Sequence, residues 1–489
     1  MGTISKNFSY SEFEVTDHKE FEFKNKITST EVRDSICALV EEVIQPLRDA
    51  WGKPLHINSG YRCPELNAKV GGVPTSQHCF DVSTEILTNN GWKTNTTIST
   101  DDYVYTYNFQ TGGIELKPIN NIIRRHHTGN LYRIHNKHLD VVCTDMHNVI
   151  VRYDYNKYIR HGTNKISEAG QKYFDSLKTN NDQFHFEKMI DVVGKRRHFM
   201  TCGYSTETAD FDVDFMRFIM AVVADGYFGY HCGKTPYIGF HVKKERKITY
   251  LKVLMESLNI KYSMRKEKDD TVYFYVGKAI ANKALDIIGK GKNLPNYILK
   301  ADIRTLRELV GVYTFFDGHA DNRPNNIGIS ISSVNYNNIS ILQAMCVLSG
   351  MRCTMSRREG HPNIIRGKQV KSAKPVYSLS ICPDCISSKF KEESAEIIPY
   401  TGEVWCIQDD NDTVIIRRNG LVSIQGNCKG EAADVACDSP VKLARLARDL
   451  KLPYDQMILY PTFVHFSHKL NGKQRGQILY NKRYKGEQL

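Results

Sequence analysis

One short motif of this chain is written in two pieces that stand far apart. Residues 76–78 supply the letters S-x-H, and residues 428–434 continue with x-x-G-x-A-x-D after 349 intervening residues. The intervening segment begins with Cys79 and ends with Asn427, and Cys428 follows it. Thiols at both junctions and a side-chain amide before the second are nucleophiles that can transfer acyl groups and cut a chain. The pattern therefore predicts one interrupted protein and one insert that removes itself.

The net charge of +12 is unevenly spread along the chain. Residues 1–78 carry −2 and residues 428–489 carry +5, which leaves +9 for residues 79–427. A basic insert fits a polyanionic partner such as DNA, and a mild bias over a long segment is the alternative. The basic tail, 469–485, is equally compatible with an anionic cell wall.

Composition narrows the class of protein. Residues 1–20 lack the apolar core of an export signal, and the longest apolar run, 215–223, is too short to span a membrane. The 13 cysteines show no regular spacing, which favours reduced thiols. We therefore expect a monomeric, cytoplasmic precursor without a membrane contact.

The outer segments predict one compact α+β unit of 140 residues. Helices are expected at 29–51 and 441–450, a strand that runs into a turn at 56–62, and a strand at 463–466. Pro46 is expected to kink or end the first helix.

The insert is expected to combine two kinds of structure. Short strands and turns open it at 85–143 and close it at 402–424. Its centre holds two apolar helical stretches, 215–223 and 306–315, each running into Asp-Gly and then into β-like and helical sequence. This internal repeat of roughly 90 residues predicts an α/β domain between two strand-rich parts. The whole chain is therefore expected to be an α+β multidomain protein.

Three blocks of the insert stand out together: residues 79–88 with 91–92, the T-x-x-H at 144–147, and a last block formed by 404–407, 414–418, 419–420 and 426–427. With them, the insert resembles an intein over its whole length. The resemblance implies a mostly-β Hint splicing domain in two parts, 79–204 and 396–427, that needs no cofactor.

The junction nucleophiles suggest an order of steps. The Cys79 thiol attacks the carbonyl of His78 and converts an amide into a thioester. Cys428 takes over the acyl group, and Asn427 cyclises through its side-chain amide onto its own carbonyl and cuts the chain. The freed amine of Cys428 then moves the acyl group from sulfur to nitrogen, which leaves a normal peptide bond between residues 78 and 428.

An amide is a poor acyl donor, so the first step needs oxyanion stabilisation and a proton for the departing amine. The intein resemblance gives these tasks to Thr144 and His147, and the alternative is a strand-end pair that only packs. Two positions depart from the family pattern: Cys406 stands where Asp is frequent, and Gly426 stands where His is frequent. Cys406 is either catalytic or an ordinary buried thiol.

Residues 220–226 (M-A-V-V-A-D-G) and 310–318 (V-G-V-Y-T-F-F-D-G) resemble the two motifs of LAGLIDADG homing endonucleases. The resemblance implies an endonuclease domain over 205–395 in which Asp225 and Asp317 lie side by side and bind Mg²⁺. Adjacent carboxylates repel unless divalent cations sit between them, and such cations can activate water for phosphodiester cleavage. Double-stranded DNA is the expected partner, read by strands in the major groove.

Smaller features of the centre also carry expectations. Ala221 and Gly311 are expected to let the two helices pack closely. Lys243 and Lys244 are candidates for phosphate contacts, with a solvated charge run as the alternative. The C-x-x-C at 382–385 has no partner pair and is interpreted as a turn.

The S-G-Y-R at 59–62, the joined string and the V-H-F-S at 464–467 belong to the outer segments. Once joined, these segments resemble the M15 family of zinc peptidases, which act on peptidoglycan peptides, with halves at 1–78 and 428–489. The resemblance implies that Arg62 binds a substrate carboxylate. It also implies a Zn²⁺ site with room for a water and three protein ligands: His78, Asp434 and His465.

One element of that family pattern is missing. Relatives usually carry a carboxylate shortly before the last His as general base, and residues 460–464 contain none. Glu431, Asp455 and Tyr460 stay open for this role.

Three interpretations remain at this stage. The first is a self-splicing intein with an endonuclease, inside a murein peptidase that acts on the cell wall after phage-type release. The second is a splicing-dead insert in a non-catalytic cell-wall-binding domain. The third is a hedgehog-like protein that ligates another molecule to His78, which the presence of Asn427 and of a meaningful C-terminal half disfavours.

Overall fold

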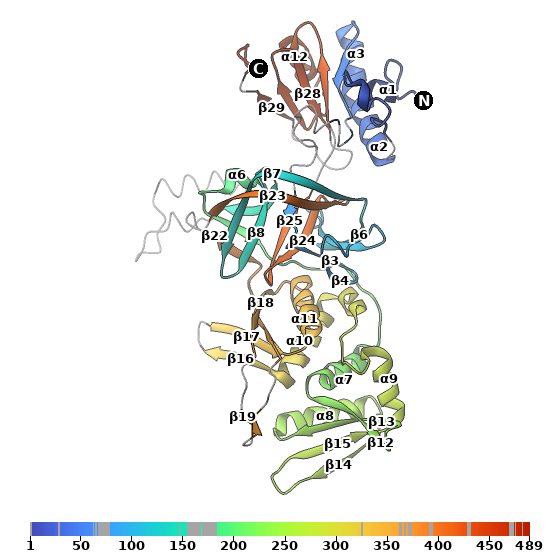
Figure 1. The fold of residues 1–489 in the computed structure, drawn as a ribbon, viewed down its shortest axis with the longest axis vertical. Coiled ribbons are helices and arrows are strands. Elements are labelled where there is room, and N and C mark those ends of the chain that lie inside the picture. The colour runs from blue at the N-terminus through green and yellow to red at the C-terminus, as the bar shows by residue number, and fades with distance from the viewer. Residues whose placement is uncertain are drawn as a thin grey trace. The chain divides into compact units, whose positions relative to one another are not determined.

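The structure is a computed structural model in which the chain divides into two compact units, Met1–Gln77 with Cys428–Leu489, and His78–Asn427 (Figure 1). Three predicted site residues, Arg62, His78 and Cys428, lie outside the described residues. Within the described part, none of the helices combines the length and apolar character needed to cross a bilayer. The described residues are 2–27, 30–61, 63, 66, 79–145, 147–153, 168, 183–323, 326–360, 364–365, 368–369, 374–390, 395–427, 432–468, 474, 476–481 and 483–489.

The first unit contains a five-stranded sheet of order β1-β26-β28-β27-β29. Its strands are β1 (His56–Ser59), β26 (Ala432–Ala436), β28 (Phe463–Ser467), β27 (Gln456–Leu459) and β29 (Gln477–Tyr480). Strand β1 comes from the N-terminal segment and pairs antiparallel with β26 of the C-terminal segment, with Ile57 opposite Val435. The two outer segments therefore build one sheet, although 349 residues separate them in sequence.

A nearly continuous helical stretch supplies much of the apolar core of this unit: α2 (Thr30–Leu39), the π-helical turn η2 (Val40–Ile44) and α3 (Gln45–Trp51). Val43, Ile44 and Leu47 are fully buried and cluster with sheet residues such as Phe466. The helix continues through Pro46, and the wider π-turn directly before it accommodates a residue that has no N–H to donate. The remaining helices are α1 (Tyr10–Phe13), η1 (Lys19–Phe21) and α12 (Pro440–Asp449).

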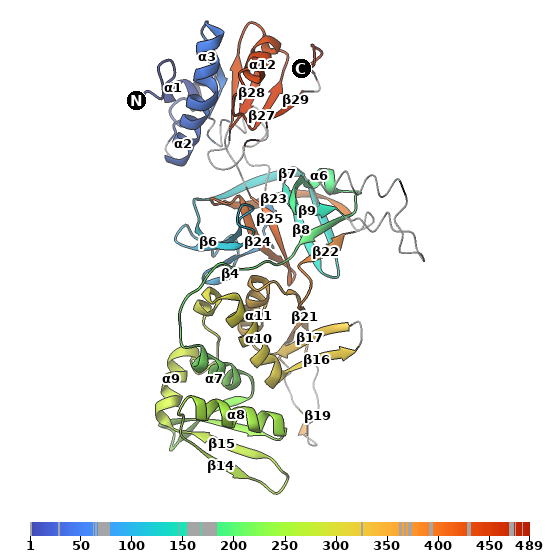
Figure 2. The ribbon, with the colours of Figure 1, turned by 180° about the vertical axis from the view of Figure 1, so that it is seen from behind.

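The second unit is rich in strands and mixes them with helices (Figure 2). A closed barrel runs through β2 (Phe80–Asp81), β23 (Ala395–Gln408), β7 (Asn121–Asn136) and β8 (Leu139–Thr144). The long strands β7 and β23 pair antiparallel over the whole of β23 and residues 121–134 of β7. Phe80 at the start of the insert pairs with both Trp405 and Cys143. The first and last parts of the insert therefore share one β structure.

A 14-stranded sheet continues from this region into the centre of the unit. Its last hairpin joins β24 to β25 through Asn419 and Gly420, which both have positive φ, as the tightest hairpin turns require. Because β25 ends at Gly426, Asn427 follows the last strand directly. The strands are β3 (Glu85–Thr88), β4 (Gly91–Lys93), β5 (Tyr103–Tyr107), β6 (Ile114–Pro118), β9 (Asn148–Tyr153), β10 (His185–Lys188), β11 (Arg197–Met200), β16 (Gly318–Arg323), β17 (Asn326–Ser333), β18 (Arg352–Arg358), β21 (Val376–Cys382), β22 (Ser387–Phe390), β24 (Thr413–Arg418) and β25 (Leu421–Gly426).

The centre of the insert repeats one order of elements. The first copy runs α7 (Val213–Ala224), β12 (Gly226–His231), β13 (Thr235–Val242), α8 (Glu245–Ser257), β14 (Tyr262–Lys266) and β15 (Val272–Val276). The second runs α10 (Ile303–Asp317), β16, β17, α11 (Tyr336–Leu348), β18 and β21. The strands lie in equivalent orders, β12-β13-β15-β14 and β16-β17-β21-β18. The internal repeat expected from the sequence is therefore confirmed. The copies are joined by α9 (Lys278–Ile288) and η4 (Asn296–Lys300).

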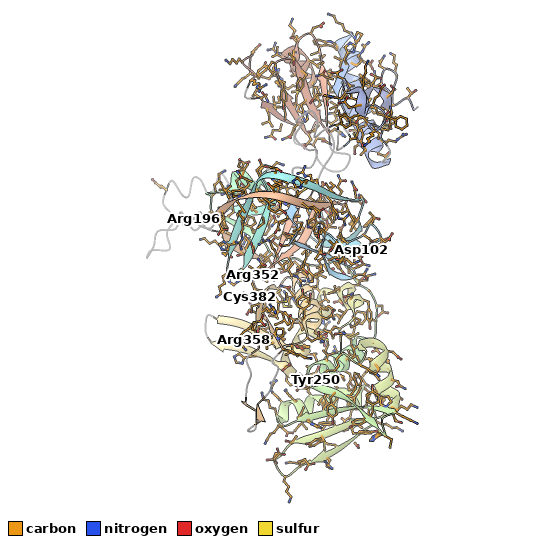
Figure 3. All side chains as sticks on the ribbon, in the orientation of Figure 1. Asp102, Arg196, Tyr250, Arg352, Arg358 and Cys382 are labelled. Atoms are coloured by element: carbon orange, nitrogen blue, oxygen red, sulfur yellow. The ribbon has the colours of Figure 1, made fainter. Side chains whose placement is uncertain are left out.

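Aromatic side chains pack against one another where the two copies meet. Tyr250 on α8, which Figure 3 labels, packs against Phe315 and Phe316 of α10, with ring centroids 5.0 and 5.5 Å apart. Ala221 is fully buried, as expected, but the expectation for Gly311 is wrong, because a Cβ there meets nothing within 4 Å. Ala221 lies five residues before the glycine that follows its helix and Gly311 lies seven before, so the two do not occupy equivalent faces.

Candidate functional site

Cys79, the first residue of the insert, lies beside Thr144, the last residue of β8. The Cys79 N–H donates a hydrogen bond to Thr144 Oγ1 at 3.3 Å, and the Thr144 N–H donates to the Cys79 carbonyl at 3.1 Å. Both residues are at most 1% exposed. The Thr144 hydroxyl therefore lies at the nitrogen of the peptide bond between residues 78 and 79.

His147 follows in the turn after β8 and is fully buried. Its N–H donates to the Thr144 carbonyl at 3.2 Å, and its ring contacts the Phe80 ring with centroids 4.3 Å apart. The fold thus brings Cys79 and Phe80 together with Thr144 and His147, although Thr144 lies 65 residues after Cys79 in sequence.

Asn427, at the other end of the insert, is fully buried. Its N–H donates to the Asp412 carbonyl at 3.0 Å, and its Nδ2 donates to Asp409 Oδ2 at 2.6 Å. Burial raises the pKa of Asp409 to about 8. Asp409 could not be singled out from the sequence, because the acidic run 409–412 has the composition of a turn.

Gly426, the residue before Asn427, has no room for a side chain. A Cβ at this position would lie 2.6 Å from Asn148 Cβ and 2.7 Å from the Asn148 carbonyl oxygen. A histidine, which is frequent here in inteins, therefore cannot be accommodated unless β9 moves.

Two further thiols are buried near the first junction. Cys406 on β23 is fully buried and follows Trp405, which pairs with Phe80. Cys143 on β8 also pairs with Phe80, and burial followed by the charge of Asp81 raises its pKa well above the usual range. Cys143 was missed in the sequence because nothing in its spacing distinguishes it from an ordinary strand residue.

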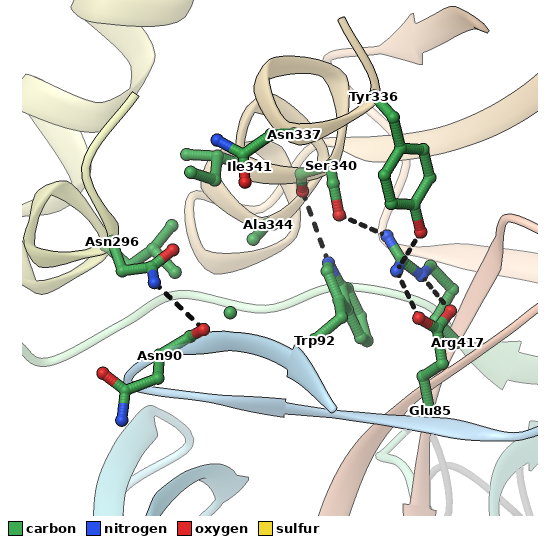
Figure 4. Close-up of a pocket in the computed structure, with 12 residues that line it drawn as sticks. Glu85, Asn90, Trp92, Asn296, Tyr336, Asn337, Ser340, Ile341, Ala344 and Arg417 are labelled. Carbon is green, nitrogen blue, oxygen red and sulfur yellow. Dashed lines mark hydrogen bonds and ion pairs between the residues drawn. The ribbon is translucent and has the colours of Figure 1, made fainter. Parts of the chain in front are cut away.

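Two adjacent arginines on β24 hold the hairpin that leads to Asn427. Arg417, only 1% exposed, makes two hydrogen bonds of 2.6 Å to the Glu85 carboxylate (Figure 4). It also donates to Ser340 Oγ at 2.7 Å and to Tyr336 OH at 2.8 Å, both on α11. Its guanidinium lies 4.5 Å from the Trp92 ring centroid.

Arg418 makes a different set of contacts. It pairs with Asp81 Oδ2 at 3.1 Å and with Asp140 Oδ2 at 2.7 Å, and Arg133 also binds Asp140, at 2.9 Å. The hairpin is therefore tied to α11 through one arginine and to strands β2 and β8 through the next.

Asp225 and Asp317 lie at the ends of the equivalent helices α7 and α10, and a glycine follows each. A Cβ at Gly226 or at Gly318 would lie 2.8 Å from a Cα of the preceding helical turn, so both chains turn back in the same way. Burial raises the pKa of Asp317, and the negative charge of Asp225 raises it further. The two carboxyl groups are therefore close enough to repel.

Ammonium groups lie beside this acid pair. Lys247 makes an ion pair with Asp225, and burial lowers the pKa of Lys292. Carboxylate and carbonyl oxygens are the ligands that Mg²⁺ prefers, so the donor set fits this ion, which would compete with Lys247 for Asp225. Lys292 Nζ donates at 2.7–3.4 Å to carbonyls at the end of α7: Val222, Val223 and Gly226.

The β12-β13-β15-β14 sheet carries a row of partly exposed aromatic and imidazole side chains. His231 Nε2 lies 2.9 Å from Tyr275 OH, and Tyr227 OH lies 2.8 Å from His241 Nε2. Lys243, 63% exposed, pairs with Asp269 at 3.7 Å. Lys244 is exposed at the start of α8.

In the first unit, Asp434 on β26 and His465 on β28 stand opposite each other. His465 Nδ1 lies 2.7 Å from Asp434 Oδ1, and the side chains are 28% and 22% exposed. Two ligands of one tetrahedral Zn²⁺ lie about 3.4 Å from each other. The Asp434 and His465 side chains would therefore have to move slightly apart to bind the metal together. His78 lies outside the described residues, and within the described part no three His, Cys, Asp or Glu side chains group as metal ligands.

Two of the three residues left open as general base lie in the described part of the chain. Asp455 is 3% exposed, and its N–H donates to the Ser467 carbonyl at 2.7 Å. The Tyr460 ring stacks on Phe463 with centroids 4.3 Å apart. Glu431 lies outside the described residues.

Parts of the chain are similar to known proteins. The chain is 25% identical over 371 residues to the ribonucleoside-diphosphate reductase subunit beta of Aquifex aeolicus (strain VF5), covering 72% of this chain and half of that protein. The structure of I-DmoI in complex with DNA and Mn shares 17% identity at a TM-score of 0.25, covering 35% of this chain and 91% of that one. The N-terminal LAGLIDADG domain of DUF199/WhiA shares 10% identity at a TM-score of 0.24, covering 35% and 78%.

The N-terminal part of the chain matches a protein family. Residues 6–100 fit the family model of Peptidase M15. Residues 6–77 of this match lie in the first compact unit, and residues 78–100 lie in the second. The N-terminal part of the chain is thus similar to the M15 peptidases.

Proposed function

We propose that residues 79–427 are an intein that excises itself and joins His78 to Cys428, and that the joined product is an M15-type zinc peptidase. The observation that carries the splicing proposal is the hydrogen bond from the Cys79 N–H to Thr144 Oγ1. It places a hydroxyl at the nitrogen that must leave when the thiol attacks, in a site shielded from water.

The residues divide the splicing steps among them. Cys79 Sγ gives up its proton and bonds to the carbonyl carbon of His78, and the carbon–nitrogen bond breaks. The amine takes a proton that we assign to His147, and the proton from the thiol replaces it. Thr144 holds that amine, Cys428 accepts the acyl group, and Asn427 cuts the second junction. Atoms of the chain alone carry these bond changes, so the splicing needs no cofactor.

The partial similarity to a reductase subunit supports an insert that is independent of its host. The outer segments hold 140 residues, so an alignment over 72% of 489 residues includes more than half of 79–427. A reductase subunit and a peptidase share no activity. A segment similar in both fits a transferable element, which we place at 79–204 and 396–427 for splicing and 205–395 for the endonuclease.

The endonuclease proposal is supported by the pair Asp225 and Asp317 at the ends of equivalent helices. A Mg²⁺ held by these carboxylates supplies an activated water and stabilises a leaving oxygen when it is bound. The sheet that begins at β12 presents stacking and hydrogen-bonding side chains to double-stranded DNA. The net charge of +9 on the insert favours that partner.

The peptidase proposal is supported by the family match over 6–100 and by the sheet that both outer segments share. Asp434 and His465 hold the metal with His78, and Arg62 binds the carboxylate of a peptidoglycan peptide. The precursor and the excised insert act in the cytoplasm, and the peptidase acts on the cell wall after release.

Expression of the full chain under reducing conditions tests splicing. We expect the 56.0 kDa precursor to yield products of about 40 and about 16 kDa, and mass spectrometry to find a peptide that joins residue 78 to residue 428. The variants Cys79→Ala and Asn427→Ala should each abolish that peptide. Persistence of the intact chain with reduced thiols would contradict the proposal and favour a splicing-dead insert in a cell-wall-binding protein.

A further inference from the structure

Asp409 and Asn427 form a buried pair at the end of the insert. Asp409 directly follows β23 and is 5% exposed, and Asn427 is fully buried. Asn427 Nδ2 donates to Asp409 Oδ2 at 2.6 Å across 18 residues of sequence. This nitrogen is the atom that must attack the Asn427 carbonyl when the side chain cyclises.

The other oxygen of Asp409 belongs to a chain of hydroxyl groups. Asp409 Oδ1 accepts from the Asn411 N–H at 2.8 Å and lies 3.2 Å from Thr106 Oγ1. Thr106 Oγ1 lies 2.8 Å from Thr413 Oγ1, which donates to the Tyr107 carbonyl at 2.9 Å. When Asp409 is ionised, Thr106 donates to it. When Asp409 Oδ2 takes up a proton, Oδ1 still accepts from the Asn411 N–H and from Thr106, so the heavy atoms around Oδ1 need not move.

The usual helper of this step is absent for a structural reason. A side chain at Gly426 would collide with Asn148, so no imidazole can stand next to Asn427 at that position. The proton acceptor must therefore come from another part of the fold, and Asp409 already contacts the attacking nitrogen.

We propose that Asp409 is the base for the cyclisation of Asn427, an inference that rests on the splicing activity proposed above. Asn427 Nδ2 bonds to the Asn427 carbonyl carbon, and one Nδ2 proton passes to Asp409 Oδ2. The bond from that carbon to the nitrogen of residue 428 breaks, and the departing amine takes a proton from water. Asp409 then returns its proton to water, so the insert ends in a succinimide and no proton is gained or lost overall.

This role makes the cyclisation pH-dependent. Burial raises the pKa of Asp409 to about 8, and the charges of Asp412 and Asp410 contribute to the rise. Because the ionised carboxylate is the base, the rate should increase as the pH rises through about 8 and should level off above it.

The test separates cyclisation from thioester formation. In a full chain carrying Cys79→Ala, release of the fragment 428–489 reports cyclisation alone. Adding Asp409→Asn should slow this release at least about 100-fold and remove its rise with pH. The matched control is Asp410→Asn, because Asp410 accepts from Asn120 Nδ2 at 2.8 Å instead of contacting Asn427. Because the Asp410 charge contributes to the raised pKa of Asp409, this control should keep the rise with pH at a somewhat lower pH and should release the fragment at the parent rate above that rise.

A second measurement keeps the outcomes distinct. In a chain that retains Cys79, release of the fragment 1–78 by added thiol reports folding and the first step, and Asp409→Asn should preserve it. Equal cyclisation rates and pH profiles with and without Asp409 would overturn its role and leave splicing intact. Failure of the unmodified chain to release either fragment would overturn splicing itself. If Asp409→Asn abolishes both releases, a flat pH profile for the parent from about pH 6 to about pH 9 would overturn the role.

Discussion

At the scale of single residues, the sequence identifies the reacting groups at the two ends of the insert. It does not identify the residues that assist them. Cys79 and Asn427 are identifiable because acyl transfer and chain cleavage need a thiol and an amide at those positions. Asp409 is not, because its function depends on a hairpin that brings residue 409 to residue 427. The absence of a side chain at Gly426 is visible in the sequence, but its cause, the close approach of Asn148, is not.

Asp317→Asn should remove a proposed Mg²⁺ ligand. It should also remove the loss of folding stability that ionisation of Asp317 causes. The pKa of Asp317 is raised in the folded state, so above about pH 4 the unfolded chain loses this proton first and stability falls as the pH rises. We expect the stability of the variant to fall less between about pH 4 and pH 7 than that of the parent. We also expect Mg²⁺ to raise the melting temperature of the parent but not of the variant.

Thermal unfolding with and without Mg²⁺ at both pH values checks this expectation. The control Asp286→Asn changes an exposed carboxylate on α9 and should keep the Mg²⁺ effect. Equal Mg²⁺ stabilisation of the parent and Asp317→Asn would show that the carboxylate does not bind the ion.

At the scale of elements, the spacing of apolar residues predicts where the two repeated helices lie. It does not predict the order of the strands within a sheet. The apolar stretches at 215–223 and 306–315 lie inside α7 and α10, because a buried helix needs apolar residues at helical spacing. The first-second-fourth-third strand order of the two copies depends on which apolar faces meet, which local sequence does not encode. Pro46 illustrates the same limit, since the sequence predicts an interruption of the helix here but not that it takes the form of a π-turn before the proline.

The β24–β25 hairpin should depend strongly on Arg417. Replacing it with Met removes a buried guanidinium and leaves Glu85, 23% exposed, without its charged partner. We expect a loss of about 3 kcal/mol in the free energy of unfolding, measured by urea denaturation in a chain carrying Cys79→Ala and Asn427→Ala. The control Arg357→Met breaks an exposed pair with Glu359 and should cost less than about 0.5 kcal/mol. Equal losses would show that the Arg417 contacts do not stabilise the insert.

At the scale of the whole molecule, the split motif predicts the division into host and insert. It does not predict that the two host segments form one sheet. The split motif predicts that residues 78 and 428 become neighbours. It does not predict that β1 and β26 already pair, because strand partners across 349 residues leave no local signal.

A chain in which residue 78 is joined directly to residue 428 should fold and bind one Zn²⁺ per molecule. Both halves of the sheet and its core are present in it, and it supplies His78 next to the pair Asp434–His465. His465→Ala should lose the metal, as measured by metal analysis after dialysis. The control His56→Ala alters an exposed residue of the same sheet and should retain the metal. Zinc retention by His465→Ala would remove this residue from the ligand set.

The pairing of β1 with β26 also affects how the host segments fold during synthesis on the ribosome. At about 5–20 residues per second, synthesis of the 349 residues between the two outer segments takes roughly 20–70 s. During that interval the helical stretch through Val43 and Leu47 has left the exit tunnel, and the strands that bury it have not been made. The nascent host must therefore be shielded, by a chaperone or by its own weak collapse, until translation is nearly complete.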